Sequence, residues 1–519
     1  LSESNASPTS ALYHSMAQGH YLTDTYYGTL QFIPWQGREL YIPELAVGRL
    51  VETPDEMMTV IDAFLANDGL AANTALVTGY DFLQDHGLAV KELLTGYSLP
   101  TQTLLTNNWT ASQLRSAFLA QRNDLVSLNG HFRHNSALAA NRSVLSSTDV
   151  VNGTADLTGS VIFTLGCRSG LSVPDVDSGT GPATLDFAQA FARRGATFVA
   201  NTGNGYGDSE EIALSELLLY YFTQRLGKSG GTTVGEAHLK ARQQYIHWAG
   251  RGGFGPYDEK VLGISTLYGL PMYRVSLPGS LMASPSWGQS APVLNENELS
   301  DTDQAMTPMA VASSIEAAAG GPGIQTVTLN PSFTRVDTPA GDYYTVTNAE
   351  PGDGRQARPG LPVMPRLGVE IDAASSAHGA LFLSGTYADE AFPTPLVTSI
   401  ITEDVSLEND QPFPGWYPVQ LGVINRLDLA RETLERLVVI PAQYRDGTLR
   451  RYTGLTYEVY YSNNDDYSAP EVRLVEHSPA QGGITFSVLV KEEFALHKIV
   501  VTWSRDGSGS WSSLPQGYD

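Results

Sequence analysis

Two residues that could form a nucleophile and its base follow two runs typical of buried strands. The apolar, β-branched run 161–165 leads to Cys167, which is the only cysteine in the chain, and the run 125–128 leads to His131. Ligands in open α/β sheets bind at the carboxyl ends of the parallel strands, so a thiol and an imidazole placed there can meet. An imidazole within hydrogen-bond reach generates the nucleophilic thiolate by taking its proton. We therefore predict a Cys/His nucleophilic pair.

Other readings of the same residues stay open. A lone cysteine at a strand end is often only a small buried apolar residue. His134 is an alternative base and His86 a weaker one. Zinc needs three or four ligands at suitable spacing, and His131 with His134 does not supply them, so no metal ligands are assigned.

A glycine-rich stretch, NTGNGYGD at 201–208, follows a strand-like run and precedes a helix-like one. It lacks the spacing of a phosphate-binding loop and carries acidic residues. We therefore interpret it as a substrate-cleft loop, with Asn201 and Tyr206 as candidate pocket residues.

The elements that must position these residues alternate along the first half of the chain. Strand-like and helix-like segments follow one another from about residue 74 to 276, which is typical of a mostly parallel sheet with helices on both faces. Thr53 before Pro54 predicts the start of a helix over 56–66. The expected strands are 75–80, 101–106, 124–129, 160–165, 196–202 and 267–275, and the other expected helices are 88–94, 110–120, 185–194, 211–226 and the one opened by Thr233 and Glu236.

The second half of the chain reads differently. Residues rich in Pro, Ser, Gly and Ala give way to short β-rich runs between turns, the pattern of β-sandwich modules. The expected domains are an N-terminal subdomain (1–72), an α/β catalytic domain (73–276), a linker (277–323), a β-sandwich (324–465) and a small β module (466–519).

Composition narrows the function classes. The 519 residues carry a net charge of −24, which argues against nucleic-acid and anionic-membrane partners. No apolar run approaches the roughly 20 residues of a membrane span. A single cysteine excludes an intramolecular disulfide. Because the sequence begins at Leu1 without a signal peptide, we expect a processed or excised piece of a longer chain.

Five motifs in order resemble the gingipain-type cysteine peptidases of the caspase-like clan. They are GH at 130–131, GCRSG at 166–170, NTGNGYGD at 201–208, VGEA at 234–237 and LYGLPMY at 267–273. The resemblance covers about residues 20–276. It implies a caspase-like fold and a catalytic dyad of His131 and Cys167.

The resemblance also implies an oxyanion hole made by the backbone N–H groups of Cys167 and of the residue after the histidine. That residue is usually Gly in the family and is Phe132 here. Any residue except Pro supplies the donor, but a phenylalanine crowds the cleft. Members often bind a basic side chain before the scissile bond through an acidic pocket residue, for which Asp81 and Asp85 are the candidates.

The β-rich half carries further resemblances. Segments 354–365 and 438–461 look like the prodomain of the same family, and the segment from 466 is similar to an immunoglobulin-like domain. The resemblance and the acidic composition are both compatible with a structural Ca²⁺ ion, although no segment matches an EF-hand loop and the predicted reaction requires no cofactor.

These observations together predict an extracellular or cell-surface cysteine endopeptidase that acts on proteins or peptides through an acyl-enzyme. Other segments of a larger surface-protein chain are its expected partners. The alternative is a catalytically silent caspase-like scaffold in a surface adhesion, filament or binding protein. A Phe132 side chain that fills the space over Cys167 would favour the scaffold.

Overall fold

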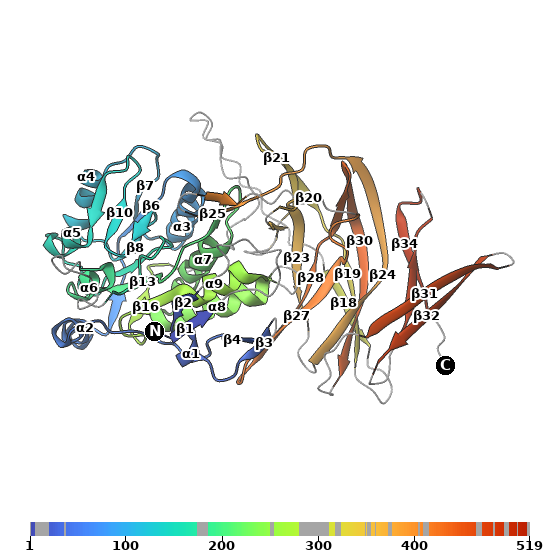
Figure 1. Ribbon diagram of the computed structural model, residues 1–519, viewed down its shortest axis with the longest axis horizontal. Coiled ribbons are helices and arrows are strands. Elements are labelled where there is room, and N and C mark those ends of the chain that lie inside the picture. The colour runs from blue at the N-terminus through green and yellow to red at the C-terminus, as the bar shows by residue number, and fades with distance from the viewer. Residues whose placement is uncertain are drawn as a thin grey trace.

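A computed structural model of the chain shows an α/β half followed by an all-β half (Figure 1). The structure describes residues 2–5, 20–35, 38–173, 185–249, 254–279, 311–316, 323–347, 349, 354–358, 360–371, 376–402, 405–407, 415–462, 470–480, 483–492, 498–505 and 507–515.

The α/β half is built on one six-stranded sheet. Five strands run parallel, and the strand at one edge is antiparallel to its neighbour. In order across the sheet they are β16 (Ser265–Tyr268), β13 (Thr197–Asn201), β12 (Val161–Phe163), β8 (Leu125–Ser127), β6 (Ala75–Thr78) and β7 (Thr101–Leu104). The mostly parallel sheet expected from the sequence is confirmed.

Helices cover both faces of this sheet because successive strand residues alternate between two apolar cores. In β12, for example, Val161 and Phe163 pack into one core and Ile162 into the other. The first core is covered by α3 (Gln84–Gly96), α7 (Leu214–Leu226), α8 (Val234–Ala249) and α9 (Pro256–Ile264). The second is covered by α4 (Ala111–Leu114), a π-helical turn η3 (Arg115–Leu119), α5 (Ser147–Asn152) and α6 (Phe187–Ala192), with α2 (Pro54–Ala66) packed on α6.

Small elements complete this half. The helix predicted from Thr53 and Pro54 is α2, which the Thr53 side chain caps by accepting a hydrogen bond from the Glu56 N–H. The remaining elements are β1 (Ser2–Asn5), β2 (His20–Thr23), α1 (Thr25–Gly28), β3 (Ile33–Trp35), β4 (Arg38–Leu40), β5 (Gly69–Ala71), η2 (Asp81–Leu83), β14 (Gly207–Asp208), β15 (Thr232–Thr233) and β17 (Arg274–Ser276).

A three-stranded antiparallel sheet lies in the stretch that the sequence shows only as a polar insertion. It consists of β9 (Phe132–Arg133), β10 (Ser136–Leu138) and β11 (Val144–Ser146). Its first strand begins immediately after His131, so this small sheet continues directly from one of the predicted catalytic residues.

The second half consists of antiparallel sheets, as expected. The largest contains β18 (Val311–Glu316), β19 (Ile324–Leu329), β30 (Thr448–Ser462), β24 (Ser376–Ala391), β34 (Ser510–Pro515), β33 (Val500–Trp503) and, paired with β30, β29 (Ala442–Arg445). A four-stranded sheet contains β22 (Gly354–Gln356), β23 (Met364–Glu370), β28 (Thr433–Val439) and β27 (Gly422–Asp428). Two-stranded pairs are β20 (Phe333–Thr338) with β21 (Gly341–Val346), and β31 (Glu471–Ala480) with β32 (Gly483–Lys491).

Two features bear on the expected domain boundaries. Most of the linker expected at 277–323 lies outside the described residues, but β18 falls within it and pairs with β19. In the last segment β34 pairs with β24, so this strand belongs to the large sheet of the preceding β region. The division into domains stays a prediction.

The two halves meet beside the α/β sheet. β25 (Ile400–Thr402) pairs antiparallel with β14 on one side and with β26 (Val405–Leu407) on the other. Figure 1 shows β25 reaching from the all-β half to the region of α3 and α7. The all-β half therefore contributes a strand to the loop region of the α/β half.

Candidate active site

His131 and Cys167 lie at the same edge of the sheet, on neighbouring strands. β8 and β12 are parallel, with Ser127 facing Phe163, and the chain continues for the same number of residues from each of these to His131 and to Cys167. The Leu128 N–H extends the pairing by donating to the Phe163 carbonyl at 2.8 Å. Equal register on adjacent parallel strands places both residues in the loop region after the carboxyl ends.

The backbone of His131 is held by Tyr80, which lies in the loop after the adjacent strand β6. The His131 N–H donates to the Tyr80 hydroxyl at 3.1 Å, and that hydroxyl donates to the Leu138 carbonyl at 2.9 Å. The rings of Tyr80 and His131 also meet edge to face, with centroids 5.4 Å apart. Tyr80 therefore links the His131 backbone to β10.

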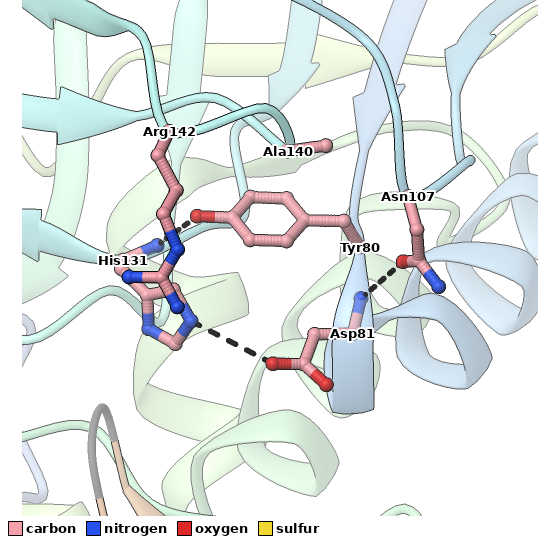
Figure 2. A pocket seen from close by; sticks show the side chains of 6 residues that line it. All are labelled: Tyr80, Asp81, Asn107, His131, Ala140 and Arg142. Atoms are coloured by element: carbon pink, nitrogen blue, oxygen red, sulfur yellow. Dashed lines mark hydrogen bonds and ion pairs between the residues drawn. The ribbon is translucent and has the colours of Figure 1, made fainter.

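One carboxylate faces the His131 ring across a pocket. The Asp81 Oδ2 atom lies 3.9 Å from His131 Nε2, and the Asp81 side chain is 68% exposed (Figure 2). Asp81 has a left-handed backbone, φ 59°, and its N–H donates to Asn107 Oδ1 at 2.7 Å. Because a non-glycine residue in this conformation is strained, the surrounding contacts hold Asp81 in place.

That pocket has a volume of about 160 Å³. Figure 2 shows Asp81 and Arg142 at different positions around the His131 ring. Cys167 does not line it. The lining residues are Tyr80, Asp81, Asn107, His131, Ala140 and Arg142.

Cys167 lies in a tight turn after β12. It is 5% exposed, and its Sγ donates to the Gly205 carbonyl at 3.6 Å. The end of β13 and the loop that follows it brace the turn, because Asn201 Nδ2 donates to the Leu165 carbonyl at 2.8 Å and the Arg168 N–H donates to the Gly203 carbonyl at 2.7 Å. The thiol is thus positioned by two loops rather than by a strand.

Phe132 has its ring in the apolar core. Its side chain is 2% exposed and packs against Phe187, with ring centroids 5.4 Å apart. A Cβ atom on Gly166 would come within 2.3 Å of this ring, so glycine is required where the Phe132 ring meets the cysteine turn. The Phe132 ring therefore determines how closely the loop that carries His131 packs against the turn that carries Cys167.

The backbone N–H of Phe132 points away from β10. The Leu138 N–H donates to the His131 carbonyl, so His131, just before β9, and Leu138 of β10 form a hydrogen-bonded pair. Because such pairs alternate with non-hydrogen-bonded pairs in an antiparallel sheet, the next pair, Phe132 and Ala137, is not hydrogen-bonded. The pairing of β9 with β10 thus leaves the Phe132 N–H, the expected oxyanion-hole donor, available.

The remaining predicted pocket residues lie elsewhere or have other contacts. Asp85 does not line the pocket, and its Oδ1 accepts the His86 N–H at 2.7 Å. Asn201 braces the cysteine turn, as described above. Tyr206 is 2% exposed, its ring meets that of Tyr257, and burial raises the pKa of its hydroxyl group.

Neither alternative base lines the pocket. Burial lowers the pKa of His86 to about 3, so its imidazole is neutral inside the core. Burial and, next, the charge of Arg133 lower the pKa of His134. His131 is thus the histidine that lies in the pocket.

An acidic cluster next to β14 was not recognised from the sequence. Its carboxyl groups are buried where the two halves meet, and burial raises the pKa of Asp85 and of Asp208 to about 7. Burial likewise raises the pKa of Glu211 and, to well above its usual range, that of Glu216. Arg355 of β22 pairs with Glu211. No local pattern could have revealed this cluster, because the arginine and the strand that pack beside its carboxyl groups come from the other half of the chain.

The described residues contain no group of three His, Cys, Asp or Glu side chains arranged to hold a metal ion. The structural calcium ion stays a prediction. Within the same residues, no helix is both long and apolar enough to cross a membrane.

Comparison with protein-family profiles identifies a matching family. The profile of peptidase family C25 matches residues 5–276. A search of the curated proteins finds no match.

The chain is also similar to solved structures at low identity. The crystal structure of the Arg-specific cysteine proteinase gingipain R is 14% identical, with a TM-score of 0.38, over 63% of this chain and 73% of that one. The complex of the RgpB pro- and mature domains from Porphyromonas gingivalis is 12% identical, with a TM-score of 0.37, over 80% of each chain. A structure of gingipain K from the same organism, described in terms of zymogenic latency, is 13% identical, with a TM-score of 0.20, over 31% of this chain and 96% of that one.

The family match spans more than half of the chain and contains both the cysteine turn and the histidine loop. The chain therefore belongs to peptidase family C25, the gingipain family of cysteine peptidases.

Proposed function

We propose that this chain is an endopeptidase in which His131 and Cys167 form the catalytic dyad. The observation that carries the proposal is their equal register on neighbouring parallel strands. His131 takes the thiol proton, and the thiolate attacks the peptide carbonyl to form a tetrahedral adduct. His131 then returns the proton to the leaving amine, and water hydrolyses the acyl-enzyme.

Two neighbouring groups support this chemistry. The Phe132 N–H, directed away from β10, is available to stabilise the oxyanion together with the Cys167 N–H. Asp81, 3.9 Å from His131 Nε2, favours the imidazolium that forms during the reaction. Asp81 is solvent-exposed, so its electrostatic contribution is screened by salt.

A basic residue before the cleaved bond is the specificity that the family resemblance suggests. Of the two candidate acids, Asp81 lines the pocket, whereas Asp85 is part of the buried cluster between the halves. Asp81 is therefore the acid that we assign to this contact. We place the protein outside the cell or at its surface, as the resemblance suggests.

A specific observation favours a second candidate, the silent scaffold of a surface adhesion, filament or binding protein. Cys167 is 5% exposed and its thiol donates to the Gly205 carbonyl. A thiol held in this way could be inert unless the loop after β13 moves.

Labelling of Cys167 separates the two candidates. A peptidyl electrophile with Arg or Lys before the reactive group is compared with an Asp-bearing probe, on the wild type, His131→Ala and, as a matched control, His134→Ala. Rapid labelling that prefers the basic probe, needs His131 and tolerates the loss of His134 supports the peptidase. Labelling no faster than that of a free thiol, and indifferent to His131, supports the scaffold.

A further inference from the structure

The pocket beside His131 contains a cation that the mechanism above does not use. Arg142 lines this pocket, and its side chain is exposed. Arg142 forms no ion pair with any residue that the structure describes. A guanidinium in this position is available to a ligand.

The backbone at Arg142 is held in a conformation that glycine would adopt at lower cost. Its φ is 66°, in the turn between β10 and β11, where a non-glycine residue costs about 1 kcal/mol. Its N–H donates to the Ala139 carbonyl at 2.7 Å, and the next residue, Ser143, accepts the Ala111 N–H at 2.8 Å. The guanidinium is therefore carried by a rigid turn.

Left-handed residues gather around this site. Asp81 and Arg142 line the pocket, and Arg168, φ 55°, directly follows Cys167. Strained backbone of this kind concentrates where side chains bind ligands or take part in reactions. The turn at Arg142 fits that pattern.

The roles of His131 and Cys167 indicate where each half of a substrate lies, and this inference rests on the proposed function. The carbonyl carbon of the cleaved bond must lie at Cys167 Sγ, and the amine nitrogen must lie near His131, which protonates it. The pocket contains His131 but not Cys167. Asp81, which lies at a different position around the His131 ring (Figure 2), is assigned above to the residue before the cleaved bond. We therefore assign a group in contact with Arg142 to the leaving half of the substrate.

We propose that Arg142 is a specificity-determining residue that binds a carboxylate on the residue following the cleaved bond. The carboxylate is an acidic side chain or the free C-terminus of the substrate, because a guanidinium binds either in the same bidentate way. A substrate recognised by Asp81 and Arg142 together carries a positive charge before its cleaved bond and a negative charge after it.

The test uses the full chain and quenched peptides that differ only in the residue after a fixed basic residue, namely Asp, Ala or Lys. The wild type should cleave the Asp peptide with a kcat/KM about three- to tenfold above that of the Ala peptide, and added salt should reduce this ratio. In Arg142→Ala the ratio should fall to about one, and in Arg142→Glu the Lys peptide should become the preferred one.

Arg133→Ala is the matched control, because Arg133 is an exposed arginine of the same small sheet that does not line the pocket. It should keep the wild-type ratio. A further pair of peptides ends at the Ala after the cleaved bond, with a free or an amidated carboxyl group. If the peptide with the free carboxyl group is cleaved faster than the amidated one, and this preference needs Arg142, the bound carboxylate is the C-terminus. If only the Asp, Ala and Lys peptides show a preference that needs Arg142, the bound carboxylate is the acidic side chain.

Failure of this proposal is distinguishable from failure of the proposed function. The electrophilic probe has no leaving residue, so it tests the dyad without the Arg142 contact. If Cys167 is labelled rapidly but neither peptide series shows a preference that depends on Arg142, the assignment of Arg142 is wrong and the peptidase stands. If Cys167 is not labelled and no peptide is cleaved, both proposals are wrong.

Discussion

The hydroxyl group of Tyr80 replaces one of the two backbone hydrogen bonds that would otherwise join His131 to Leu138 of β10. It accepts the His131 N–H at 3.1 Å and donates to the Leu138 carbonyl at 2.9 Å. In an unmodified antiparallel pair these two groups would bond to each other. Tyr80 therefore takes part in the first residue pair of the small sheet and holds His131 at the pocket.

Removing this hydroxyl should weaken both the fold and the site. In Tyr80→Phe the ring contacts remain, but the His131 N–H and the Leu138 carbonyl lose their partner, which should lower the free energy of unfolding by about 1–3 kcal/mol. Cys167 labelling should slow because His131 is less well fixed. Denaturant titration and labelling rates check this. Tyr27→Phe, at a side chain that is 57% exposed, is the control, and equal behaviour of the two variants would contradict the role of Tyr80.

Substitution of Asp81 should slow the labelling of Cys167 while changing the stability of the fold little. Glycine adopts the left-handed backbone freely, so Asp81→Gly should change the free energy of unfolding by no more than about 1 kcal/mol. The rate at which an uncharged electrophile labels Cys167 should fall about two- to fivefold, because the exposed carboxylate no longer favours the His131 imidazolium. Asp81→Asn keeps the backbone preference without the charge and should show the same loss. A wild-type rate in Asp81→Asn would show that the charge is not used.

The cysteine turn should not tolerate a methyl group at Gly205. A Cβ atom there would lie 1.9 Å from the Leu165 carbonyl oxygen, so Gly205→Ala must displace the loop whose carbonyl accepts the Cys167 thiol. We expect a loss of about 3 kcal/mol in unfolding free energy. Gly379→Ala is the matched control, because a Cβ atom there has no neighbour within 4 Å. Equal melting temperatures for the two variants would refute the close approach.

The interface between the halves should weaken as the pH rises. The pKa of Asp208 is raised to about 7 by burial, so the folded state binds its proton more tightly than the unfolded state, in which the value is near 3.9. Stability from this group is complete at acidic pH and is lost as the pH rises through 7. The carboxylates of Asp85, Glu211 and Glu216 act in the same direction, whereas Arg355 opposes them.

Asp208→Asn isolates this contribution, because burial of His86 gives an opposing pH dependence that both proteins share. Relative to the wild type, the variant should gain thermal stability steadily between about pH 4 and pH 7 and show a constant difference above that. Melting curves at several pH values measure the difference. A difference that does not change with pH would mean that Asp208 ionises normally in the folded protein.

The sequence predicted those parts of the fold that depend on local pattern. The runs 125–128 and 161–165 contain β8 and β12, because strands buried on both faces are mostly apolar. Strand order is not a local property, so the placement of Tyr80 next to His131 could not be predicted. The turn that carries Arg142 was hidden in a polar stretch whose strands are only two or three residues long.

The pairing of β14 with β25 has a consequence for the order of biosynthesis. Ser209 donates its backbone N–H to the Ser399 carbonyl at 3.0 Å, so this contact joins segments that emerge from the ribosome far apart in time. The nascent catalytic half therefore lacks both the strand and the arginine that bury this acidic cluster, and closing so long a loop is a slow, late step of folding.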